Sequence, residues 1–235
     1  KTRLYDVSGN ELAALEGNFS SFSDDGQRLV TYSRSDEKTR LYDVSGNELA
    51  AFEGNFSSFS DDGQRLVTYS FSDGKTRLYD VSGNELAALE GNFRSFSDDG
   101  QQFAVYSSKE QRSRLYSLSG QPTGVELKGR FSEFSPNQQY IVTVVASEDI
   151  SLIYDTAGNL LAEYPGSAFG GRGDDLGFTP DSSQLITKSN DGLYHIWQLD
   201  NGLDDLLARG CEWAKPYLQA NQETETRAAF CLTDY

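Results

Sequence analysis

Residues 1–37 read KTRLYDVSGNELAALEGNFSSFSDDGQRLVTYSRSDE, and residues 38–74 repeat this stretch with three substitutions. The substituted pairs are Leu15/Phe52, Arg34/Phe71 and Glu37/Gly74. A third unit begins at residue 75, and more divergent units begin near residues 112, 150 and 193. A fixed period of this length is typical of architectures in which one small unit packs on the next. The sequence therefore predicts one repeat domain over residues 1–200.

Each unit alternates short apolar segments with turn residues. In the first unit the pattern predicts strands at residues 3–7, 11–15, 18–23 and 27–33. Gly9-Asn10 and Asp24-Asp25-Gly26 are typical of tight turns between antiparallel strands. No segment combines the length and the 3.6-residue apolar period of a helix. One unit should therefore supply four antiparallel strands.

A lone four-stranded sheet with apolar side chains on both faces cannot bury them. Copies stacked face to face around an axis bury both faces and leave only short edges exposed. We therefore expect an all-β propeller of four-stranded antiparallel blades, with about five to six blades represented. The units supply two strands, then four whole blades, then three strands, which is not a complete ring. Further blades before Lys1 are the favoured explanation; a capping helix or a second chain are the alternatives.

The repeated residues resemble those of the WD-repeat family. The turn at residues 22–26, FSDDG, is similar to the family's Phe-Ser-Pro-Asp-Gly turn. Residues 70–80, SFSDGKTRLYD, are similar to its Ser-x-Asp-x-Thr-x-Arg-Leu-Trp-Asp stretch. The family's Gly-His is Gly-Asn in the first three units here, and its Trp is Tyr except at Trp197.

In that family a His, a Ser or Thr, an Asp and the Trp form a polar network that braces each blade. The resemblance implies that Asn18, Thr31 or Ser33, Asp36 and Tyr5 substitute for this network in the first unit. The bracing positions it implies across the chain are Tyr5, Asp36, Tyr42, Asp73, Tyr79, Tyr154 and Trp197.

Residues 201–235 leave the repeat pattern and carry apolar residues at helical spacing, which predicts a short C-terminal helical tail. This tail resembles the end of many cyanobacterial WD-repeat proteins, whose propeller follows a STAND-type NTPase or a protease-like effector domain and acts as a sensor. Two cysteines, Cys211 and Cys231, lie in it. They are too few for a disulfide scaffold. They are either joined in one disulfide or packed as two small apolar side chains.

Composition excludes several function classes. The net charge of −16 argues against nucleic-acid partners and against anionic membrane surfaces. No apolar run is long enough to span a bilayer, and no secretory leader opens the chain, so we expect a cytoplasmic location. The single histidine, His195, and the two tail cysteines are too few to form a nucleophilic triad or a zinc site. We therefore expect no enzymatic activity, no cofactor and no metal.

The paired acids in the turns, such as Asp24-Asp25, are either cation ligands or turn-forming residues. Adjacent side chains in one hairpin turn point apart, and calcium takes six to eight oxygens. Turn formation is therefore the favoured explanation.

The positions that differ between near-identical units are the candidate partner-binding residues. All of them lie after the last strand of a unit, in the loop between the second and third strands of a blade, namely Arg34, Glu37, Phe71, Gly74, Ser108 and Gln111. An exposed aromatic such as Phe71 is a typical interaction anchor. Ordinary drift in a tolerant loop is the alternative.

The sequence thus predicts a protein- or peptide-binding propeller, the sensor or scaffold part of a larger bacterial signalling protein, and self-association through its repeats is a further expectation. A carbohydrate-binding or hydrolytic propeller and a purely structural repeat are the alternatives.

Overall fold

The computed structural model describes residues 1–169, 176–199, 210–211 and 213. These residues form strands β1 to β21, and of the described residues Gly210, Cys211 and Trp213 alone have α-helical backbone. Consecutive strands pair antiparallel in chain order within six separate sheets. The predicted all-β fold of four-stranded antiparallel sheets is therefore confirmed, and we number the sheets as blades 0 to 5.

Blade 0 contains β1 (Thr2–Tyr5) and β2 (Glu11–Leu15). Blade 1 contains β3 (Asn18–Phe22), β4 (Arg28–Ser33), β5 (Lys38–Asp43) and β6 (Glu48–Glu53). Blade 2 contains β7 (Asn55–Phe59), β8 (Arg65–Ser70), β9 (Lys75–Asp80) and β10 (Glu85–Glu90). Blade 3 contains β11 (Asn92–Phe96), β12 (Gln102–Ser107), β13 (Arg112–Ser117) and β14 (Pro122–Lys128). Blade 4 contains β15 (Arg130–Phe134), β16 (Tyr140–Val145), β17 (Ile150–Asp155) and β18 (Leu160–Pro165). Blade 5 contains β19 (Gly177–Phe178), β20 (Gln184–Lys188) and β21 (Tyr194–Gln198).

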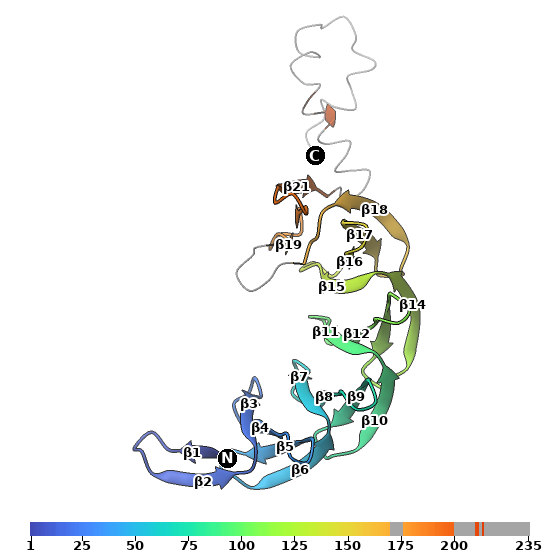
Figure 1. The fold of residues 1–235 in the computed structure, drawn as a ribbon. Coiled ribbons are helices and arrows are strands. Elements are labelled where there is room, and N and C mark those ends of the chain that lie inside the picture. Colours follow the sequence, from blue (N-terminus) through green and yellow to red (C-terminus); the bar gives the residue numbers. More distant parts are fainter. Residues whose placement is uncertain (170–175, 200–209, 212, 214–235) are drawn as a thin grey trace, which may run out of the picture.

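The blades follow one another along an open arc (Figure 1). The first strands β3, β7, β11 and β15 lie on the concave side, and the last strands β6, β10, β14 and β18 lie on the convex side. Blade 0 and blade 5 stand at the two ends of the arc, so the described residues do not close a ring. The expected helical tail lies outside the described residues except for Gly210, Cys211 and Trp213.

Neighbouring blades are held together by apolar side chains between their faces. Leu41 and Phe52 of blade 1 pack with Phe59, Leu66 and Tyr79 of blade 2, and all five are buried. Because side chains alternate along a strand, each blade presents one apolar set to the blade before it and another to the blade after it. Equivalent clusters join the other neighbouring blades.

The first predicted strand is too long, because its end is a turn. The Asp6 carboxylate accepts hydrogen bonds from the backbone N–H groups of Ser8 and Asn10 at 2.9 and 2.8 Å. Val7 is consequently fully exposed and not part of a buried strand.

The acid pairs also act in turns. Asp25 Oδ1 accepts from Ser23 Oγ at 2.6 Å and from the Gln27 N–H at 2.9 Å, and Asp62 and Asp99 repeat this arrangement. No group of three or more His, Cys, Asp or Glu side chains suited to a metal ion occurs in the described part of the chain. Nor does that part contain a helix long and apolar enough to cross a membrane.

Candidate partner-binding site

Each blade is connected to the next by a crossing glycine, which approaches the loop between the second and third strands, here named the middle loop. The Gly54 N–H donates to the carbonyl of Glu37 at 2.9 Å, and the Gly91 N–H donates to the carbonyl of Gly74 at 3.1 Å. Gly129 donates in the same way to Gln111 at 2.9 Å. The middle loops and the crossing glycines therefore share one face of the arc, which we name the crossing rim.

One of the two variable positions has a backbone role. Glu37, Gly74 and Gln111 have φ angles of 54°, 70° and 55°. This left-handed conformation suits glycine and strains other residues. The variation between these three residues therefore concerns a turn whose carbonyl holds the crossing glycine, and it is not by itself a sign of partner contact.

The other variable position is exposed on the rim. The Phe71 side chain is 78% exposed and meets the Tyr69 ring edge-on, with ring centroids 5.0 Å apart. Phe71 lines a cavity of about 490 Å³ between blades 1 and 2 together with Arg34 and Glu37. The structure thus brings three candidate residues together, whereas Gly74, Ser108 and Gln111 do not line this cavity.

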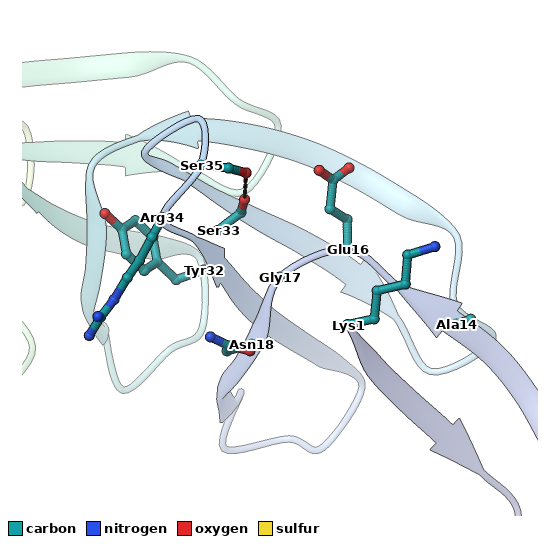
Figure 2. A pocket seen from close by; sticks show the side chains of 9 residues that line it. All are labelled: Lys1, Ala14, Glu16, Gly17, Asn18, Tyr32, Ser33, Arg34 and Ser35. Atoms are coloured by element: carbon teal, nitrogen blue, oxygen red, sulfur yellow. Dashed lines mark hydrogen bonds between the residues drawn. The ribbon is translucent and has the colours of Figure 1, made fainter.

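Arg34 also borders a second cavity, of about 630 Å³, beside blade 0. Figure 2 shows the Arg34 and Asn18 side chains at its wall, with Glu16 and Lys1 farther toward blade 0. Ser33 and Ser35 are joined by a hydrogen bond of 2.9 Å, which shapes the start of the middle loop (Figure 2). Arg34, like Asn18 and Tyr32, therefore lines both cavities.

Threonines fasten the crossing segments, among them Thr31, which the family resemblance implied and whose Oγ1 donates to the carbonyl of Glu16. Thr39 Oγ1 of blade 1 donates to the carbonyl of Gly54 at 2.8 Å, and Thr68 Oγ1 of blade 2 donates to the carbonyl of Glu53. Both threonines are fully buried, so these bonds satisfy backbone groups that water cannot reach. The available signal for Thr39 was a threonine or serine at the second residue of β5, β9, β13 and β17.

The aromatic residues at the bracing positions implied by the family resemblance differ in their hydrogen bonds and in their burial. The Lys128 N–H of blade 3 donates to the Tyr154 hydroxyl of blade 4 at 3.2 Å, and within blade 5 Trp197 Nε1 donates to Thr187 Oγ1 at 2.9 Å. Tyr42 and Tyr79 are buried between blades, and burial raises the pKa of Tyr79 to about 12. Tyr5 is half exposed.

Asp36 and Asp73 do not join these crossing contacts. Asp36 forms an ion pair with Arg40, and Asp73 forms one with Arg77, both within the same blade. The Arg40 guanidinium also lies 3.7 Å from a Glu16 carboxylate oxygen and 3.6 Å from a Glu48 carboxylate oxygen. These aspartates therefore fix the middle loop to the third strand of their blade.

No family model and no curated protein matches this chain.

The surroundings of His195 differ from those of a catalytic base. Its Nε2 lies 3.2 Å from Ser189 Oγ, and Ser189 Oγ also donates to Asp191. In a nucleophilic triad the imidazole lies between the hydroxyl and the carboxylate. Here the hydroxyl lies between the other two, and the set closes the turn between β20 and β21.

The aspartate ion pairs predict how stability depends on pH. The Arg40 guanidinium lowers the pKa of Asp36 from 3.8 to about 2, and Arg77 does the same for Asp73. Because the folded pKa lies below the unfolded one, this stabilisation is complete above about pH 4 and disappears between about pH 4 and pH 2. Urea unfolding midpoints should fall over that range, and they should fall less in an Asp36→Asn/Asp73→Asn variant. An equal fall in both proteins would contradict the assignment.

Proposed function

We propose that this chain is part of a WD-repeat-like β-propeller that binds a protein or peptide segment on its crossing rim, without catalysis. The observation that carries the proposal is Phe71. Phenylalanines that pack between the blades, such as Phe52 and Phe103, are buried, whereas Phe71 is 78% exposed within the rim. Exposing a large apolar ring costs free energy that burial against a partner recovers.

Arg34 supports the same surface. It is exposed, and it lies across the inter-blade cavity from Phe71. Aromatic and arginine side chains are enriched among residues that dominate binding energy. A segment lying along the rim would contact both side chains while the rigid blades keep their spacing.

The role as sensor or scaffold of a larger bacterial signalling protein belongs to this proposal and rests on the family resemblance of the repeats and the tail. We also propose a cytoplasmic location. The disulfide at Cys211 counts against this location, because thiol reductants in a bacterial cytoplasm act against such bonds. A count of free thiols on protein purified from cells under alkylating conditions tests the location. Free thiols at both cysteines would agree with the cytoplasm, and their absence would contradict it.

The binding surface is tested with a peptide selected from a displayed random library on the full chain. We expect a Phe71→Ala/Arg34→Ala variant to bind that peptide at least about tenfold more weakly, the loss of roughly one strong anchor. Titration calorimetry measures the affinities. Leu49→Ala is the control, because Leu49 is 47% exposed on the convex strand β6.

Two results would contradict the proposal. Equal affinity in the parent, the rim variant and the control would exclude the rim as the binding surface. A library that yields no binder, together with glycan binding that the rim variant loses, would favour the carbohydrate-binding alternative.

A further inference from the structure

Two arginines lie on first strands, at the concave side of the arc. Arg94 is the third residue of β11, and Arg130 is the first residue of β15. The corresponding residues of blades 1 and 2 are serines and asparagines: Ser20 and Ser57, and Asn18 and Asn55. A chain of net charge −16 thus places two cations side by side where earlier blades carry neutral polar groups.

The two guanidinium groups share one aromatic ring. The Arg130 Cζ lies 3.8 Å from the centroid of the Phe169 ring, and the Arg94 Cζ lies 5.5 Å from it. Arg94 Nε donates to the carbonyl of Phe131 at 3.1 Å, which fixes its direction. The Phe169 ring therefore lies against both groups, and a backbone contact also fixes Arg94.

Within the part of the chain that the structure describes, these two arginines have no ion-pair partner, unlike several other arginines. Arg40, Arg77 and Arg114 form ion pairs with acids of their own blades. Neither Arg94 nor Arg130 forms an ion pair within the described ranges, and Arg130 Nε is buried without a hydrogen-bond partner. Burial, and then the neighbouring positive charge of Arg130, lower the pKa of Arg94 to about 10.

We propose that Arg94, Arg130 and Phe169 form a binding site for a carboxylate group of an acidic peptide segment. A carboxylate accepts two parallel hydrogen bonds from a guanidinium edge, and it neutralises the repulsion between two adjacent cations. Phe169 lies against both guanidinium groups, and the contact of Arg94 with Phe131 uses only its Nε, which leaves its terminal N–H groups for the ligand. The inference rests on the proposed peptide-binding function and names the acidic class of partner that this function would take.

The test measures the affinity of the full chain for N-acetylated tetraglutamate at low salt by titration calorimetry. We expect the parent to bind this probe, and an Arg94→Gln/Arg130→Gln variant to bind it at least about tenfold more weakly. An Arg40→Gln/Arg77→Gln variant removes the same charge from the third strands of blades 1 and 2 and should bind as the parent does. Tetraglutamine, which lacks the carboxylates, should not bind.

Three outcomes would overturn the carboxylate site. They are no binding of tetraglutamate, equal weakening in both double variants, and binding of inorganic phosphate more tightly than tetraglutamate. The library-selected peptide keeps the two proposals separate. A loss of its affinity in the Phe71→Ala/Arg34→Ala variant concerns only the rim. If tetraglutamate fails while that peptide still depends on Phe71, the arginine site is wrong and the proposed function stands.

Discussion

Replacing Phe59 by alanine should lower the free energy of unfolding by about 3–5 kcal/mol, the range typical of a buried phenylalanine. Phe59 is 9% exposed and packs against blade 1 through Val30, Leu41 and Phe52. The substitution leaves a cavity between two rigid sheets, which cannot close without shifting a whole blade. Urea unfolding followed by tryptophan and tyrosine fluorescence measures the loss. Leu49→Ala, on the convex side, should cost less than about 1 kcal/mol, and a similar cost for both variants would contradict this packing.

Gly91→Ala is the second substitution with a large expected effect. Gly91 has a φ of 112°, and a Cβ there would lie 2.5 Å from the backbone oxygen of Tyr106. The strained backbone alone costs roughly 1–3 kcal/mol, and the steric clash pushes blade 3 away from the crossing segment. We expect a total loss of at least about 2 kcal/mol in thermal and urea unfolding.

Gly74→Ala separates these two causes. Gly74 has a φ of 70°, but its Cβ would meet nothing within 4 Å, so only the backbone strain remains. It should cost about 1 kcal/mol, in keeping with the presence of Glu37 and Gln111 at the same place in other blades. A Gly91→Ala variant as stable as Gly74→Ala would show that the crossing segment does not lie against β12.

The strands and their turns could be predicted from the sequence because they depend on local chemistry. The predicted 11–15 strand matches β2, and the 18–23 and 27–33 strands differ from β3 and β4 by one residue each. The strand ends differ where a side chain caps a turn. Ser23 leaves β3 because its hydroxyl bonds Asp25 and the carbonyl of Arg28.

The polar contacts between blades could not be predicted in the same way. Asp36 was expected to join a bracing network, but Arg40 is only four residues away and provides a closer partner for its charge. The crossing segment is fastened instead by Thr39 and Thr68, which lie in two different blades. A single repeat does not show which side chains of the next repeat it will meet.

The candidate binding residues were also only partly predictable. Comparison of the units identified Arg34 and Phe71, since they differ at one exposed position. It did not separate them from Glu37, whose variation follows from its φ of 54°. The Arg94 and Arg130 site was missed because it needs Phe169, which lies outside the repeat strands, in the segment after β18.

The stacking of consecutive blades in chain order is tested most directly by comparing two alanine substitutions at one repeat position. Phe22 and Phe59 occupy identical sequence surroundings, but Phe22 is 48% exposed because blade 0 has no first and second strands to cover it. We predict that Phe59→Ala lowers the free energy of unfolding by at least about 2 kcal/mol more than Phe22→Ala. Equal losses for the two variants would contradict the open, ordered stack of blades.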